Sequence, residues 1–185
     1  MITSDPSLFA SSVVKPDDFD QYWADTLGAT NTVPLNPRLT PDEMRSTDEI
    51  EVFEARYDSY GGIEIAGWYA RPRNFAGKLP GYLFVPGYVS EPKLPNDLAL
   101  RGYAAFSAAP RGKLRSNSVF NPGYPGLLAH NITKREEYGY RGFYMDAVRA
   151  FDFLAGLDEV DETRIGVQGG SQGGATIGRL HDCDH

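Results

Sequence analysis

The feature that most constrains this chain is the glycine-rich segment Gly169-Gly170-Ser171-Gln172-Gly173, which follows a short apolar pattern at residues 164–168. A G-x-S-x-G sequence between a strand and a helix places its serine on a tight turn, with the hydroxyl pointing away from the sheet. Side chains two positions before and after the serine would collide with neighbouring backbone, so both positions must be glycine. The segment predicts a strand, a sharp turn and a helix, with Ser171 as a candidate nucleophile.

This segment has two other interpretations. A short match of this kind also arises by chance in glycine-rich loops, and the chain has 20 glycines. A phosphate-binding loop would need a lysine followed by serine or threonine after its last glycine, and that lysine is missing. The preceding strand pattern and the following helix favour the turn that exposes a nucleophile.

Composition and charge exclude several classes of protein. The chain has 185 residues, 41% of them hydrophobic, which predicts one domain with a packed core. A formal net charge of −7 argues against binding to nucleic acid or to an anionic membrane. The single cysteine, Cys183, cannot form an internal disulfide. No signal peptide and no apolar run of about 18 residues is visible, so a cytoplasmic location is expected.

The remaining pattern alternates strands with helices, which predicts an α/β fold with a mostly parallel sheet and an antiparallel hairpin at its start. We expect a helix from Asp17 that ends at Gly28, and a long connection over residues 29–48. We therefore divide the chain into two parts. Residues 1–48 form an N-terminal helix and an extended arm, and residues 49–185 form a partial α/β domain. The expected strands are 50–57 and 63–69, joined at Gly61-Gly62, then 79–85, 103–108 and 164–168, with helices at 94–101 and 140–154.

An attacking serine also needs donors for the negative charge that develops on the substrate. One backbone N–H would come from Gln172, directly after the serine, and the other from the loop that follows an earlier strand. That loop begins at Pro86, after the buried pattern ending at Val85, and Tyr88 is the candidate donor. An ordinary buried tyrosine in a turn is the alternative interpretation of Tyr88.

With these residues in place, the chain resembles the acetyl xylan esterase and cephalosporin C deacetylase family of carbohydrate esterases. The matching segments follow in the family's order between about residues 15 and 174. They are 15–23 (KPDDFDQYW), 67–70 (GWYA), 87–88 (GY), 101–106 (RGYAAF), 111–112 (RG), 140–142 (YRG), 146–150 (DAVRA), 158–167 (DEVDETRIGV) and 169–174 (GGSQGG).

The resemblance implies an α/β-hydrolase fold and the removal of acetyl groups from sugars by a Ser, Asp and His triad, with no metal or organic cofactor. Ser171 would be the nucleophile, and the N–H groups of Tyr88 and Gln172 would hold the oxyanion. Members of the family are typically ring-like homohexamers, and the segment Phe19 to Trp23 resembles the part that assists those contacts.

The resemblance is lost after Gly174, which leads us to expect a fold truncated after the serine turn. The triad Asp and His would then lie beyond residue 185, since the order in such enzymes is Ser, Asp or Glu, His. His181 would stand about 15 Å along a continuing helix from Ser171, against a hydrogen-bond reach of about 3 Å. His130 has the pattern of an ordinary loop histidine. The tail from His181 to His185 is interpreted as a chain end and not as a metal site.

Three functional hypotheses follow from these observations. The first is an acetyl ester hydrolase with Ser171 as its nucleophile. The second is another α/β-hydrolase, an esterase or a peptidase. The third is a truncated, non-catalytic fragment or pseudoenzyme. The strand at 164–168 would leave an open edge in a truncated fold, so we also expect poor solubility or association.

Overall fold

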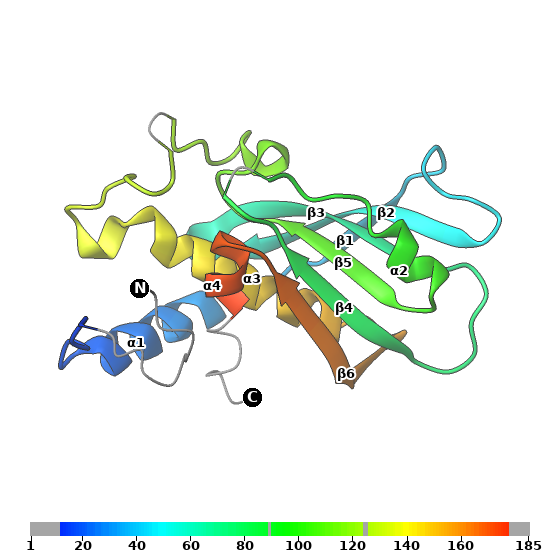
Figure 1. Ribbon diagram of the computed structural model, residues 1–185, viewed down its shortest axis with the longest axis horizontal. Helices are drawn as coiled ribbons and strands as arrows, with labels where there is room; N and C mark the ends of the chain where they lie inside the picture. The colour runs from blue at the N-terminus through cyan, green and yellow to red at the C-terminus, as the bar shows by residue number, and fades with distance from the viewer. Residues whose placement is uncertain (1–11, 89, 124–125, 178–185) are drawn as a thin grey trace, which may run out of the picture.

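The computed structural model describes residues 12–88, 90–123 and 126–177, and Figure 1 shows how their helices and strands are arranged. Six strands form one sheet in the order β1-β2-β3-β5-β4-β6. The strands are β1 (Arg38–Pro41), β2 (Ile50–Ser59), β3 (Ile63–Pro72), β4 (Leu79–Val85), β5 (Ala104–Ala109) and β6 (Val160–Gly169). The α-helices are α1 (Phe19–Asn31), α2 (Asn96–Leu100), α3 (Gly139–Ala155) and α4 (Gln172–Ile177), and short 3₁₀ turns lie at Tyr60–Gly62, Leu114–Ser116 and Arg135–Glu137.

The sheet is mixed, so the prediction of a mostly parallel sheet is wrong for the described residues. The pairs β1–β2, β2–β3 and β3–β5 run antiparallel, and the pairs β4–β5 and β4–β6 run parallel. Strands joined by short turns must run antiparallel, whereas the connections through α2 and α3 cross over to a parallel position. The predicted hairpin at Gly61-Gly62 is confirmed, and both glycines have positive φ, 76° and 72°.

Two further predictions at the N-terminal side are wrong. The first helix does not end at Gly28 but continues to Asn31, because a single glycine on an open helix surface costs only about 1 kcal/mol. The expected connection over residues 29–48 contains strand β1, in which Leu39 pairs with Ala55 of β2. The helix at 140–154 is confirmed as α3, with Gly156 as its C-cap.

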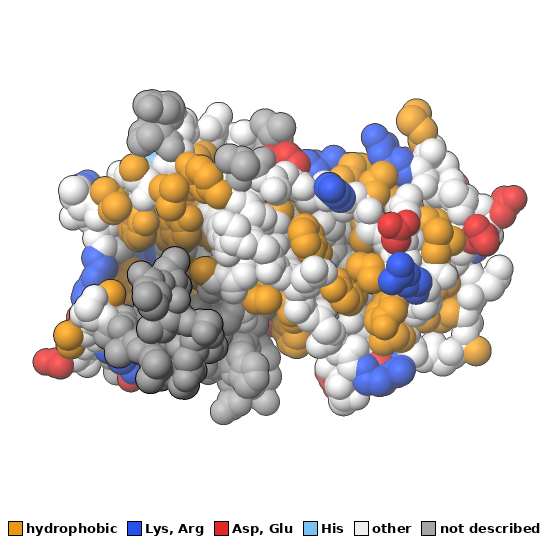
Figure 2. Space-filling model, in the orientation of Figure 1, with side chains coloured by type: hydrophobic (Ala, Val, Ile, Leu, Met, Phe, Trp, Pro, Cys, Tyr) orange, Lys and Arg blue, Asp and Glu red, His pale blue; other side chains and the backbone are white. Residues whose placement is uncertain are grey.

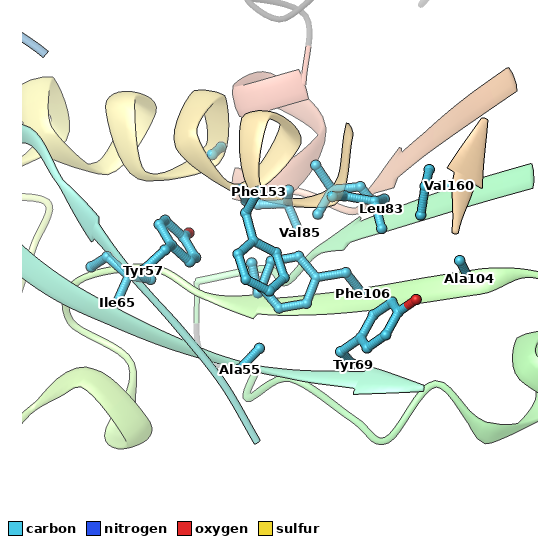
Figure 3. Packing of buried hydrophobic residues seen from close by; sticks show 14 of the residues in the cluster. Ala55, Tyr57, Ile65, Tyr69, Leu83, Val85, Ala104, Phe106, Phe153 and Val160 are labelled. Carbon is cyan, nitrogen blue, oxygen red and sulfur yellow. The ribbon is translucent and has the colours of Figure 1, made fainter. Parts of the chain in front are cut away.

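The core lies between α3 and one face of the sheet. Figure 3 shows Phe153, from α3, beside the rings of Phe106 and Tyr57 on the strands. The Phe106 and Phe153 ring centroids are 4.8 Å apart, and all three residues are at most 1% exposed. The opposite face carries a smaller cluster, in which Ala99 of α2 packs with Trp68 and its neighbours. The sheet is therefore covered by α3 on one face and in part by α2 on the other.

In the part of the chain that the structure describes, no helix has the length and apolar character needed to cross a membrane. Figure 2 shows hydrophobic side chains on one face mixed with lysine, arginine, aspartate and glutamate.

The parallel pair β4–β6 places the serine turn. Val85, the last residue of β4, is paired with Gly169, the last residue of β6. The two loops that follow these strands therefore leave the sheet side by side, and in Figure 1 both arrows end near α4. Carboxyl ends of neighbouring parallel strands are where α/β proteins commonly build their sites.

Candidate active site

The serine turn is strained at Ser171. This residue has φ 54°, in the left-handed region that non-glycine residues seldom occupy. Among the described residues only Asn36 and Asn131 share a positive φ without being glycine, and asparagine tolerates that region better than serine. The Gly173 N–H donates to the Gly170 carbonyl at 3.0 Å, and α4 begins at once. The Ser171 side chain is exposed, so this turn presents its hydroxyl to solvent.

The two glycines that flank the serine stand where no side chain fits. A Cβ atom placed on Gly169 would lie 2.3 Å from the carbonyl carbon of Gly173. A Cβ atom placed on Gly173 would lie 2.1 Å from the carbonyl oxygen of Val85. A Cβ atom placed on Gly170 would meet nothing within 4 Å, and one placed on Gly174 would lie 3.2 Å from the Gly169 carbonyl oxygen, so the closest approaches are at Gly169 and Gly173. Contact between β6, α4 and the end of β4 therefore depends on these two positions.

The loop after β4 lies against this turn. A Cβ atom placed on Gly87 would lie 3.3 Å from the Gly170 carbonyl oxygen and 3.7 Å from Cβ of Ser171. Tyr88 comes next, and its side chain is 36% exposed, so the interpretation as an ordinary buried tyrosine is wrong. The structure brings the backbone at Tyr88 and at Gln172 to the same end of the sheet as Ser171.

Gln172 is held in place by its side chain. It is 8% exposed, and its Nε2 donates to the Tyr140 hydroxyl of α3 at 2.7 Å. Burial raises the pKa of Tyr140, so this hydroxyl is neutral near pH 7. The Gln172 carbonyl accepts from the Thr176 hydroxyl at 2.8 Å. These bonds fix the first turn of α4, which follows the serine.

A cavity of about 250 Å³ opens beside the turn. Its walls include Tyr88, Arg111, Lys113, Asn121, Phe143 and Gln172. The lining combines the aromatic side chains of Tyr88 and Phe143 with amide and cationic groups, so it offers both apolar contact and hydrogen-bond donors.

A buried ion pair supports the floor of this cavity. Arg111 donates to the Asp146 carboxylate from its backbone N–H, Nε and Nη2, at 2.8, 2.8 and 2.9 Å. The two residues are 5% and 0% exposed. A Cβ atom on Gly142 would lie 2.0 Å from Arg111 Nη1, so α3 needs glycine there. The pair ties the loop after β5 to α3.

A model of the acetyl xylan esterase (AXE1) family matches residues 7–178 of this chain. The chain belongs to the acetyl xylan esterase family. Acetyl esterase Axe7A of Xylanibacter ruminicola is 26% identical over 182 residues, which cover 92% of this chain and 41% of that protein. The uncharacterized peptidase YuxL of Bacillus subtilis is 27% identical over 187 residues, 94% of this chain and 26% of that protein.

Solved structures agree with the family assignment. The acetyl xylan esterase from Paenibacillus sp. R4 has a TM-score of 0.80 at 30% identity, over 90% of this chain and 55% of that one. Acetyl xylan esterase 1 from Thermoanaerobacterium sp. JW/SL YS485 has a TM-score of 0.77 at 24% identity, over 87% of this chain and 53% of that one. The fold is that of an α/β-hydrolase. The chain spans about half the length of these two structures and less than half the length of the two curated relatives.

The histidines of this family member do not gather at the serine in the described residues. The His130 ring packs edge-to-face on Phe120 at 5.1 Å, and His130 is not among the residues that line the cavity. His181, His185 and Cys183 lie outside the described residues. Within residues 12–88, 90–123 and 126–177, no three His, Cys, Asp or Glu residues are grouped so as to hold a metal ion.

Sequence reasoning missed Lys113, a lysine that lines the cavity although it is only 2% exposed. Nothing in a loop rich in proline, glycine and asparagine signals a buried lysine. The pair Arg111-Gly112 stands out in the sequence only through the family resemblance, because Asp146, the partner of Arg111, is 35 residues away.

Proposed function

We propose that this chain supplies the nucleophile and the oxyanion-binding groups of a serine esterase that removes acetyl groups from acetylated sugars or xylo-oligosaccharides. The observation that carries the proposal is the strained, exposed Ser171 at the end of β6, in contact with the loop after β4. Strain at a single exposed serine persists only where the surrounding structure enforces it, as the two crowded glycines do here. Membership of the acetyl xylan esterase family supports esterase chemistry at this serine.

In the proposed reaction, the Ser171 hydroxyl oxygen attacks the carbonyl carbon of the acetyl ester. The carbonyl oxygen becomes an oxyanion, which accepts hydrogen bonds from the backbone N–H groups of Tyr88 and Gln172. The N-terminus of α4 adds a favourable field for this charge. Cleavage of the C–O bond releases the sugar hydroxyl and leaves the acetyl group on Ser171. Water then attacks this acyl-enzyme and frees acetate.

The serine proton must go to a general base, which in this mechanism is a histidine oriented by a carboxylate. We assign no residue of this chain to the triad Asp and His. His130 packs against Phe120 and not in the cavity, and the predicted position of His181 is too far along the chain from Ser171. Without its base, Ser171 would retain only the part of the rate that comes from the oxyanion hole and binding. A non-catalytic fragment or pseudoenzyme is the alternative that this assignment keeps open.

The proposed substrate class follows from the cavity. A volume of about 250 Å³ is small, which suits an acetyl group better than a long acyl chain. The side-chain amides of Asn121 and Gln172 offer donors to sugar hydroxyls or to the carboxylate of a cephalosporin-type acetyl ester. The proposed chemistry uses no metal and no organic cofactor.

Steady hydrolysis of p-nitrophenyl acetate, compared between the parent chain and Ser171→Ala, tests the proposal. Faster release of p-nitrophenol by the parent supports a serine esterase, and equal rates count against it. A peptidase is the second candidate function, because the chain is also similar to YuxL, which is named an uncharacterized peptidase. Parallel assays with an acetylated xylo-oligosaccharide and a peptide p-nitroanilide separate the two, since only a peptidase would cleave the anilide faster.

A further inference from the structure

Lys113 occupies an unusual position for a lysine. Its side chain is 2% exposed, and its ammonium group donates to the main-chain oxygens of Gly87 and Tyr88, the latter at 2.6 Å. Burial lowers the pKa of the Lys113 ammonium, while the Glu91 carboxylate opposes that shift. Two of the three N–H donors of the ammonium group therefore bind the main chain of the loop that lies against Ser171.

The hydrogen bond from Lys113 to the Gly87 carbonyl also affects the neighbouring Tyr88 N–H. The Gly87 carbonyl and the Tyr88 N–H are opposite ends of one planar trans peptide unit, so they point in opposite directions. A donor that fixes the carbonyl oxygen therefore also fixes the direction of the N–H. Hydrogen bonds in series also polarise one another, which makes an N–H a stronger donor when its own carbonyl is bonded to a cation.

We propose that Lys113 is a positioning residue for the oxyanion hole, because its ammonium group orients and polarises the Gly87–Tyr88 peptide unit. The inference rests on the proposed role of the Tyr88 N–H as an oxyanion donor. Lys113 touches backbone and not substrate in this role, and it acts through the N–H of Tyr88.

Backbone hydrogen bonds on both sides hold Lys113 in position. Its N–H donates to the Pro110 carbonyl at 3.1 Å, and its own carbonyl accepts from Ser116 at 2.9 Å. The neighbouring Arg111 is locked to Asp146. An amide or an apolar side chain would fill this space without the cost of burying a charge. The retained ammonium is therefore better explained by its effect on the loop than by stability.

The test compares Lys113→Met, Lys113→Gln and the parent, with Lys93→Met as a control at an exposed lysine. Two quantities are measured: the ¹⁵N–¹H chemical shift of the Tyr88 amide in ¹⁵N-tyrosine-labelled protein, and the rate at which p-nitrophenyl acetate acylates Ser171. In Lys113→Met we expect the amide proton to move upfield and the acylation rate to fall roughly 10- to 100-fold, less than outright loss of an oxyanion donor. Lys113→Gln should lie between, since it keeps one uncharged hydrogen bond, and Lys93→Met should match the parent.

A merely structural lysine would give another pattern. Its loss would lower the urea midpoint of unfolding but leave the acylation rate of the folded protein unchanged, whereas we expect the folded Lys113→Met variant to acylate more slowly. An unchanged Tyr88 amide, or a shifted amide with unchanged acylation, would overturn the proposal. If Lys113→Met does not fold, Lys113→Gln carries the same comparison. Equal acylation of the parent and Ser171→Ala would refute the proposed function instead, and the amide shift would still report on Lys113.

Discussion

The buried pair of Arg111 and Asp146 allows the sharpest stability prediction. Three charge-assisted hydrogen bonds of 2.8–2.9 Å join the two side chains and the Arg111 N–H, and Arg111 also donates to the Tyr60 carbonyl at 2.8 Å. Asp146→Asn preserves the shape of the carboxylate but leaves the guanidinium without its counter-charge. Arg111→Met leaves the opposite charge alone on α3.

The magnitude follows from the burial of both groups. Removing one partner of a buried pair typically costs about 3–5 kcal/mol, because the remaining charge has neither water nor a counter-ion. With about 2–4 °C lost per kcal/mol in a chain of this size, either variant should melt roughly 6–20 °C below the parent. A domain stable by about 5–15 kcal/mol would lose a large share of its stability.

Urea unfolding, followed by the fluorescence of the two tryptophans, measures these changes in a double-mutant cycle. We expect Asp146→Asn with Arg111→Met to cost clearly less than the sum of the single changes, because the double variant leaves no isolated charge. Glu137→Gln is the control, since its pair with Lys134 is 56% and 63% exposed and should contribute less than about 1 kcal/mol. Single variants within about 1 kcal/mol of the parent, or strictly additive costs, would refute the reasoning.

Three further predictions follow from other parts of the molecule. Ser171→Gly should have a free energy of unfolding about 0.5–1 kcal/mol higher than Ser171→Ala, measured with urea. Glycine relieves a left-handed strain of about 1–2 kcal/mol at some entropic cost, and the reverse order would mean that the turn is not strained. The Thr163 hydroxyl and then Arg164 hold the pKa of Asp161 at about 2, below its ordinary 3.8, so Asp161 stabilises the fold above about pH 4 and loses that effect as the pH falls towards about 2. Asp161→Asn should flatten this part of the acid-unfolding curve, and an unchanged curve would contradict the assignment. Gly166→Lys adds a charge on the edge strand β6, where a Cβ atom would meet only Tyr82, at 3.8 Å. This charge should reduce any self-association measured by sedimentation velocity, and unchanged association would show that β6 is not the strand through which the chains associate.

Local sequence patterns predicted the elements that depend on local physics. The stripe of apolar residues in α3 and the glycines around Ser171 need no information from elsewhere in the chain, and the structure has the helix and the tight turn in those places. Strand β1, with the sequence Arg-Leu-Thr-Pro, is too short to show an alternation, and it exists because β2 offers a free edge. The mixed strand order is likewise a result of pairing between distant segments.

In the candidate site, too, the residues with local contacts were predictable and those with distant partners were not. The serine turn was predictable because its chemistry is contained in five consecutive residues. Lys113 was not, because its partners are the carbonyls of Gly87 and Tyr88, and any residue type would have supplied those oxygens. A contact with backbone leaves no trace in the sequence of the partner, so only the folded arrangement shows it.

The most direct test of the central claim is the mass of the protein after brief exposure to p-nitrophenyl acetate, followed by peptide mapping. If Ser171 is the nucleophile, one acetyl group will be found on the peptide that contains Ser171, and Ser171→Ala will lack it. Brief exposure favours detection of the acyl-enzyme before water frees its acetate. Acetylation that is confined to lysines, or that is the same in parent and Ser171→Ala, would contradict the assignment of Ser171.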